Sequence, residues 1–319
     1  LDLSNNMALI ILECYKNRLT SLDLSKNTAL TKLWCFDSQL TSLDVSKNTA
    51  LEVLHCYDNL LTSLDVSKNT ALTDFWCNNN QLTSIDVSNN SALHMFYCKN
   101  NQLTSLDLSK NTALDYLVCE KNQLTSLDLS NNTALTSLWC SNNQLTSLNV
   151  TGLTSLLNFN CMHNPDLGSI TGLSDCSAVT YFNCSDCGLN SLDVGHMTNL
   201  GDLWCSNNLF TTLSVNNKRQ LTALAVNGNQ FLEELECYSC DLTRLEVYNC
   251  PVLNYIDCMY NQLTELDVTT CPELMYLLCE DNQLTELDIS RNSKLLYLWC
   301  RYNQLTSVDL STCPDNFLS

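Results

Sequence analysis

Apolar residues recur along the chain in two alternating patterns, each forming half of a longer repeat. The first half reads L-T-S-L-D-[LV]-S-x-N-T-A over eleven residues, and the second reads L-x-x-L-x-C-x-x-N-Q over ten. Within each half, apolar places alternate with polar ones, which is typical of a short strand with one buried face. The pattern therefore predicts two extended segments per repeat, joined by turns at their Asn-rich ends.

A cysteine marks the same place in each second half and sets the period. Fourteen ladder cysteines follow mostly at steps of 21 residues, with a step of 23 to Cys184 and an extra half-repeat around Val226. They are Cys14, Cys35, Cys56, Cys77, Cys98, Cys119, Cys140, Cys161, Cys184, Cys205, Cys237, Cys258, Cys279 and Cys300. One such coil cannot bury its own apolar stripe, whereas stacked coils bury a continuous core.

We therefore expect a leucine-rich repeat solenoid with a parallel β-sheet formed by the cysteine-bearing halves. Leu33 and Cys35 should point inward and Lys32, Trp34 and Phe36 outward, because side chains alternate along a strand. The Asn residues that end the halves should turn inward and satisfy backbone groups at the bends. A 3₁₀ turn is expected around residues 46–50.

The repeats are not equally regular along the chain. Residues 1–148 keep the 21-residue step, residues 149–236 contain glycines, Pro165 and insertions, and residues 237–319 are regular again and carry a second set of cysteines. We interpret the three stretches as one continuous solenoid domain. The chain begins inside the pattern, at "LDLSNN", so we also expect it to be a piece of a longer protein.

The half "LTSLDVSKNTAL", the 21-residue period and the cysteine ladder closely resemble the internalins, bacterial surface proteins with leucine-rich repeats. Within that family they resemble the internalin J class. The resemblance implies a curved, right-handed coil, a concave sheet and a largely extended or 3₁₀ convex side. It also implies a secreted or cell-surface adhesin that binds a protein on a host or neighbouring cell. The cap domain, immunoglobulin-like domain and wall-sorting signal usual in internalins are not in this chain.

The cysteines allow several interpretations, of which we favour buried, reduced core residues. Adjacent ladder thiols point the same way, which is poor disulfide geometry. A zinc site at "CSDC" or "CYSC" and a disulfide between Cys250 and Cys271 are alternatives. Cys187, Cys240, Cys250 and Cys271 occupy places where other repeats have Asn, as do Cys176 and Cys313, so we expect them to replace those asparagines structurally.

Charge and composition exclude several functions. Asp and Glu number 34 against 15 Lys and Arg, a net charge of −19 that should repel nucleic acid and anionic membranes. No apolar run reaches the roughly 20 residues of a membrane helix. No catalytic His constellation or glycine-rich phosphate loop recurs, so we expect neither an enzyme nor a cofactor. An Asp row (Asp23, Asp44, Asp65, Asp86, Asp107 and Asp128) could bind calcium, but side-chain capping of local backbone explains it better.

The two halves differ in how much their sequence changes from one repeat to the next, and this difference predicts the binding face. The first half is nearly invariant, whereas the second varies at outward places and carries all five Trp residues. We predict a ligand-binding surface of exposed aromatic residues on the concave sheet. It comprises Trp34, Phe36, His55, Tyr57, Trp76, Tyr97, Tyr116, Trp139, Trp204, Tyr255, Tyr276, Tyr297 and Trp299. A protein ligand and a monomer are expected. The alternatives are a glycan ligand, a purely structural spacer, and aromatic residues that only favour strands and stack on cross-strand neighbours.

Overall fold

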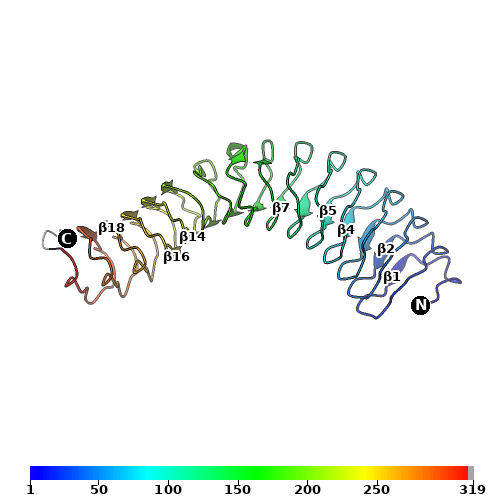
Figure 1. Cartoon of the computed structure of the whole chain (residues 1–319), viewed down its shortest axis with the longest axis horizontal. Coiled ribbons are helices and arrows are strands. Elements are labelled where there is room, and N and C mark those ends of the chain that lie inside the picture. Colours follow the sequence, from blue (N-terminus) through cyan, green and yellow to red (C-terminus); the bar gives the residue numbers. More distant parts are fainter. Residues whose placement is uncertain (315–319) are drawn as a thin grey trace. The chain divides into compact units, whose positions relative to one another are not determined.

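The structure is a computed structural model that describes residues 1–314, so the last five residues of the predicted 237–319 stretch lie outside it. The described chain falls into two compact units. Unit 1 comprises Leu1–Asn164 with Ile170–Asp175, and unit 2 comprises Pro165–Ser169 with the chain from Cys176 onward. Both units consist of stacked coils, and the predicted parallel solenoid of leucine-rich-type repeats is confirmed (Figure 1).

In unit 1 each second half contributes one short strand to a parallel sheet, which we call the first sheet. Its strands lie along the inner side of the curved stack of coils of this unit (Figure 1). Successive strands pair at a register of 21 residues, as Lys32 with Val53 and Val53 with Asp74. The strands are β1 (Ile11–Glu13), β2 (Lys32–Trp34), β3 (Val53–His55), β4 (Asp74–Trp76), β5 (Met95–Tyr97), β6 (Tyr116–Val118), β7 (Ser137–Trp139) and β9 (Asn158–Asn160). The first halves add only the pair β8 (Leu148–Asn149) and β10 (Ile170–Thr171).

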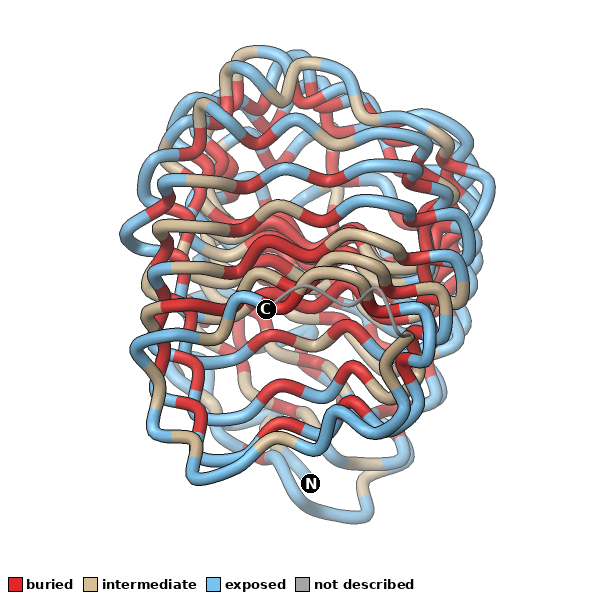
Figure 2. Tube along the Cα trace, turned by 90° about the vertical axis from the view of Figure 1, so that its left-hand side faces the viewer, coloured by how far each residue is buried: buried red, intermediate tan, exposed pale blue. Residues whose placement is uncertain are grey.

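The core of each coil is made by the inward places of both halves, as predicted. Leu33 and Cys35 are fully buried, whereas Lys32, Trp34 and Phe36 are half-buried on the outer face of the sheet. Burial alternates in this way around the coils, with exposed residues at the turns (Figure 2). Phenylalanine replaces the strand leucine in some coils, and Phe75 stacks on Phe96 with ring centroids 5.4 Å apart.

Two rows of buried asparagines tie successive coils together, which confirms the prediction that these residues turn inward. The Asn59 amide Nδ2 donates to the carbonyl oxygens of Cys35 and Cys56 at 3.0 and 3.1 Å, and its Oδ1 accepts from Leu40 N. At the end of the other half, Asn69 Nδ2 donates to the carbonyl oxygens of Val45 and Asn48. Each side chain therefore spans two coils and pairs backbone groups that would otherwise be buried without partners.

The connection around residues 46–50 has hydrogen bonds between residues three apart, as expected of the predicted 3₁₀ turn, but it does not continue into a helix. It consists of two separate turns, closed by Asn48 N donating to Val45 O and by Leu51 N donating to Asn48 O. Asn48 points into the core between the two turns, and its amide bonds to the neighbouring coil hold the backbone extended there. In residues 1–314 the one helix is the 3₁₀ element η1 (Leu173–Asp175).

Unit 2 contains strands on two sheets, half a coil apart. The first sheet runs through β11 (Tyr181–Asn183), β12 (Asp202–Trp204), β14 (Ala223–Ala225) and β16 (Arg244–Glu246). The second sheet runs through β13 (Thr212–Ser214), β15 (Glu234–Glu236), β17 (Tyr255–Asp257), β18 (Tyr276–Leu278) and β19 (Tyr297–Trp299) (Figure 1).

The extra half-repeat explains the change of sheet. Val226 takes the place of a ladder cysteine, and its strand β14 pairs with β12 at the usual 21-residue register. The next cysteine-bearing half then falls half a coil later, so β15, which precedes Cys237, pairs with β13 of a first half. From Cys237 onward the cysteine-bearing halves therefore lie in the second sheet, and the L-T-x-L-[DE]-V halves occupy the side of the first.

All twenty cysteines are present as thiols, and all are buried except Cys300 and Cys313, which are half-buried. Burial raises the pKa of the Cys56 and Cys119 thiols to about 12. The cysteines at Asn places also follow the prediction, because Cys271 Sγ donates to Val247 O at 3.4 Å, the carbonyl that an Asn side chain would reach.

Candidate binding surfaces

The outward places of the first sheet in unit 1 hold eight aromatic rings, which we call the aromatic patch. They come from strands β2 to β6 and from the residue that follows the ladder cysteine. The patch consists of Tyr15, Trp34, Phe36, His55, Tyr57, Trp76, Tyr97 and Tyr116. Identical spacing in consecutive coils places these side chains directly above one another, because the strands pair in register.

The rings of the patch stack on each other rather than standing apart. Phe36 lies between Tyr15 and Tyr57, with ring centroids 4.3 Å from each and planes inclined by only 9°. Trp76 lies 4.4 Å from Tyr97, and Tyr97 lies 5.3 Å from Tyr116. Stacking covers the ring faces and turns the edges outward, so most members are half-buried and Tyr15, 38% exposed, is the most accessible.

His55 occupies the centre of the patch and has a partner that the sequence did not indicate. Its ring stacks on Trp76 at 4.4 Å and meets Trp34 edge-on at 6.0 Å. Its Nε2 lies 3.1 Å from Oδ2 of Asp74, on the next strand. The repeat pattern did not single out Asp74, because the residue type at its place varies from coil to coil. The signal that could have indicated the pair is its position opposite Val53, two residues before Trp76. The pair fixes the His55 ring within the stack.

Burial among neighbouring rings also changes the acidity of the patch. The pKa of Tyr57 is raised, mainly by burial and further by the carboxylates of Asp58 and Asp37. Burial likewise raises the pKa of Tyr97. Both phenols therefore stay neutral and keep their O–H donors throughout the physiological pH range.

Polar side chains continue the same columns beyond the rings. Lys99 Nζ lies 2.7 Å from a carboxylate oxygen of Glu120, and Ser141 Oγ donates to the other Glu120 oxygen at 2.7 Å. These residues occupy the place that Phe36 and Tyr57 hold in earlier coils. An apolar centre beside charged and hydroxyl groups is the usual composition of a protein-binding surface.

The thirteen residues predicted as one binding face do not share one sheet. Trp34, Phe36, His55, Tyr57, Trp76, Tyr97, Tyr116, Trp139 and Trp204 lie on or directly beside strands of the first sheet, the last of them in unit 2. Tyr255, Tyr276, Tyr297 and Trp299 lie on the second sheet. Within unit 2, Trp204 and Tyr255 are therefore on different faces, because the extra half-repeat moves the later halves by half a coil.

The separated aromatic residues have their own surroundings. Tyr276 and Tyr297 stack with centroids 4.7 Å apart, and Trp299 is 44% exposed at the end of this row. On the first sheet of unit 2, the guanidinium of Arg244 lies 5.2 Å from the ring centroid of Trp204 and pairs with Glu246. Trp204 is thus covered by a cation rather than by another aromatic ring.

The Asp row of the first halves caps local turns. Oδ1 of Asp44 accepts from Ser46 N at 2.9 Å, and Oδ1 of Asp65 accepts from Ser67 N at 2.8 Å. This hydrogen bond is the main reason that the pKa of Asp65 lies below its ordinary value. In residues 1–314 no group of three or more His, Cys, Asp or Glu side chains is arranged to hold a metal ion, and no helix could span a membrane.

Comparison with known proteins finds similar chains among the solved structures. No family model and no curated protein matches the sequence. The functional domain of InlJ from Listeria monocytogenes, which includes a cysteine ladder, is 36% identical, with a TM-score of 0.66. The chain is an internalin J-like leucine-rich repeat protein with a cysteine ladder. The alignment covers 94% of this chain and 64% of the InlJ chain.

Two more distant structures share the fold of this internalin J-like chain. The internalin InlF of Listeria monocytogenes is 20% identical, with a TM-score of 0.51 and coverage of 98% of this chain and 87% of its own. YopM from Yersinia enterocolitica is also 20% identical, with a TM-score of 0.58 and coverage of 97% and 77%. Internalin-like scaffolds of this type are typically non-catalytic and bind proteins.

Proposed function

We propose that this chain is the ligand-binding solenoid of a secreted or surface-exposed bacterial protein, and that the aromatic patch of unit 1 binds a protein on another cell. The observation that carries the proposal is the unbroken stack of eight rings from Tyr15 to Tyr116, on the outer face of the sheet. Aromatic residues that gather on an outer face in this way, half-buried with their ring edges turned outward, often mark an interaction site. The similarity to internalins supports the location outside the cell.

The arrangement of the rings favours a protein ligand over a glycan. A sugar ring binds by lying on an exposed aromatic face, but the faces of Phe36, Tyr57 and Trp76 are covered by their neighbours. The outward edges, the Tyr hydroxyls and the adjoining Lys99–Glu120 pair suit the mixed apolar and polar surface of a protein. Interface aromatics commonly carry about 2 kcal/mol or more each.

The test uses substitutions that the chain already contains at equivalent places. Asn78 follows a ladder cysteine where Phe36 and Tyr57 do, so Phe36→Asn with Tyr57→Asn removes two rings but keeps a residue that the coil accommodates. Fluorescently labelled protein is applied to cultured epithelial cells, and bound protein is quantified by flow cytometry. We expect binding to fall more than tenfold, with little change in the midpoint of thermal unfolding.

The same assay distinguishes the ligand classes. The matched control is Thr41→Asn with Thr62→Asn, on exposed places of the other half of the same coils. Brief trypsin treatment of the cells should abolish binding, whereas removal of surface glycans should leave it. Loss after glycan removal alone would identify a glycan ligand, and full binding by the double Asn variant would remove the aromatic patch as the site.

A further inference from the structure

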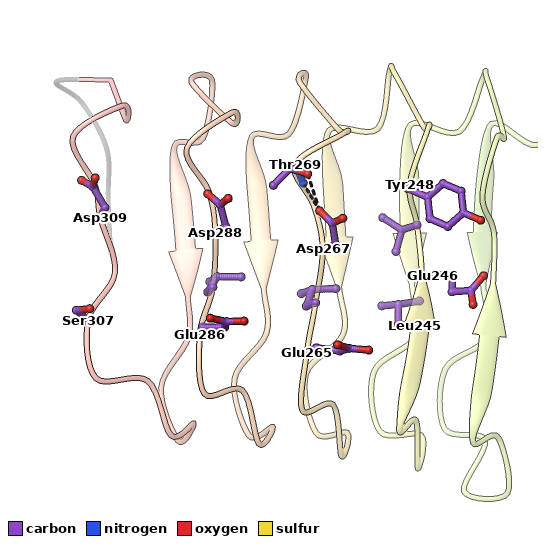
Figure 3. A pocket seen from close by; sticks show the side chains of 13 residues that line it. Leu245, Glu246, Tyr248, Glu265, Asp267, Thr269, Glu286, Asp288, Ser307 and Asp309 are labelled. Atoms are coloured by element: carbon purple, nitrogen blue, oxygen red, sulfur yellow. Dashed lines mark hydrogen bonds between the residues drawn. The ribbon is translucent and has the colours of Figure 1, made fainter.

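A groove in unit 2 lies outside the aromatic patch and was not indicated by the repeat pattern. It has a volume of about 820 Å³ and opens on the face that carries β16 and the first halves that follow it (Figure 3). Leu245, Val247, Leu266 and Leu287 form its floor. We define the acidic groove by this floor and by the side chains on its two walls.

The walls are two rows of carboxylates that flank the leucine floor (Figure 3). One row contains Glu265 and Glu286, and the other contains Glu246, Asp267, Asp288 and Asp309. Six of the thirteen described residues lining the groove are acidic and none is basic, against 34 acidic residues in 319 for the whole chain. The groove lining is therefore far richer in acidic residues than the chain as a whole.

The two rows differ in what the fold requires of them. Asp267 and Asp288 accept hydrogen bonds through Oδ1 from Thr269 N and Ser290 N, both at 2.9 Å, which caps the turns as in unit 1. Glu265 and Glu286 are exposed and occupy a place where the regular coils of unit 1 carry Ser. Those residues are Ser21, Ser42, Ser63, Ser84, Ser105, Ser126 and Ser147.

The Glu row thus adds negative charge where the coil itself needs only a small polar residue. Neighbouring coils lie about 4.8 Å apart, and carboxylates at that separation repel each other. At the Glu246 end the charge is already balanced, because Arg244 pairs with Glu246 and Asn227 donates to it at 2.7 Å. No basic side chain among the described lining residues does this for Glu265 or Glu286.

We propose that the acidic groove docks an extended, lysine- or arginine-rich segment of a partner protein. The two acidic walls can receive basic side chains from both edges of one strand, because alternate side chains point in opposite directions. The aliphatic stems of those side chains lie along the leucine floor, and Tyr248, 45% exposed, closes one end. The four coils span about 14 Å, the length of four or five extended residues. This surface is independent of the aromatic patch.

The test measures binding of a fluorescein-labelled peptide, Lys-Lys-Ser-Lys-Lys-Ser-Lys-Lys, by fluorescence anisotropy. Glu265→Ser with Glu286→Ser introduces the Ser that unit 1 carries at this place of the repeat and removes two negative charges. The matched variant, Glu52→Ser with Glu233→Ser, removes two exposed carboxylates elsewhere and keeps the same net charge. We expect the groove variant to weaken binding about five- to tenfold and the matched variant less than twofold. Binding should also weaken as salt rises from 50 to 300 mM.

Each other outcome overturns the proposal. Equal weakening by both variants would mean that the peptide senses only the overall charge of −19. Absence of binding by the unmodified protein at low salt would remove the groove as a peptide site. Calcium chloride is titrated in parallel, and a calorimetric calcium signal that is lost in the groove variant, with no peptide binding, would make it a cation site. Circular dichroism confirms that both variants are folded.

Discussion

At the scale of single residues, the fold depends on side chains that bond to the backbone of the neighbouring coil. Asn69 reaches two carbonyls of the preceding coil, and Cys271 reaches the equivalent of the first of them with its thiol. The amide has two donors and an acceptor, whereas the thiol has one weak donor. The cysteine therefore fills the place of the asparagine with fewer and weaker hydrogen bonds.

This comparison predicts opposite effects for two substitutions at one position. Cys271→Ala should lower the free energy of unfolding by about 1–2 kcal/mol, because it opens a small cavity and leaves Val247 O without its donor. Cys271→Asn should leave stability equal or higher, since the amide can reach the same carbonyl. Urea unfolding followed by circular dichroism measures both. A Cys271→Asn variant less stable than Cys271→Ala would show that the site is shaped for sulfur.

At the scale of strands and coils, the half-repeat decides which face a residue occupies. Deleting residues 221–231 would bring Cys237 to 21 residues after Cys205 and join Gln220 directly to Leu232. We expect β15 then to pair with β12 in place of β14. Nitroxide labels on Asp202→Cys and Glu234→Cys should show strong dipolar broadening in the deletion variant, because paired strands lie about 4.8 Å apart. The full-length chain, in which Ala223 pairs with Asp202, serves as the control. Equal spectra would contradict the half-coil explanation.

The repeat pattern predicts local structure well and face assignment poorly. The inward Leu33 and Cys35, the bonded Asn59 and the turn-capping Asp44 follow from places within one coil, where alternation and capping act locally. The sheet occupied by Tyr255 depends on how many half-coils precede it, which a single repeat does not encode. The repeat pattern did not indicate the His55–Asp74 pair or the Glu row of the acidic groove, because the residues that meet there come from different coils. The division at residues 148 and 236, and the ligand-binding role of the aromatic residues, stay predictions.

At the scale of the whole molecule, the buried thiols couple stability to pH. A Cys has an ordinary pKa of 9.0, and burial raises that of Cys56 and Cys119 to about 12 in the folded chain. The folded state therefore holds its thiol protons more tightly than the unfolded state does. The resulting stabilisation is complete below pH 9 and is lost as pH rises from 9 toward 12.

We expect the free energy of unfolding to fall steeply over this alkaline range. Between its unfolded and folded pKa each buried thiol should contribute a slope on the order of 1 kcal/mol per pH unit, and the ladder adds several such contributions. Urea titrations at pH 8.0 and 10.5, with reductant present, measure the fall. Cys56→Val should make it shallower by about one thiol's share. A slope unchanged by that substitution would mean that other groups cause the alkaline loss.

The half-coil at Val226 also bears on how such a chain can evolve. Recombination between repeats of the gene adds or removes whole coils, and every downstream residue then keeps its face. An event that copies only half of a repeat instead exchanges the two faces for all coils that follow, as with the strands after β14. A single genetic step of this kind would place one half-repeat sequence on the face that the other half-repeat occupies in the preceding coils. The acidic groove is built from halves that elsewhere serve as scaffold, and the half-coil places those halves on the side of the first sheet.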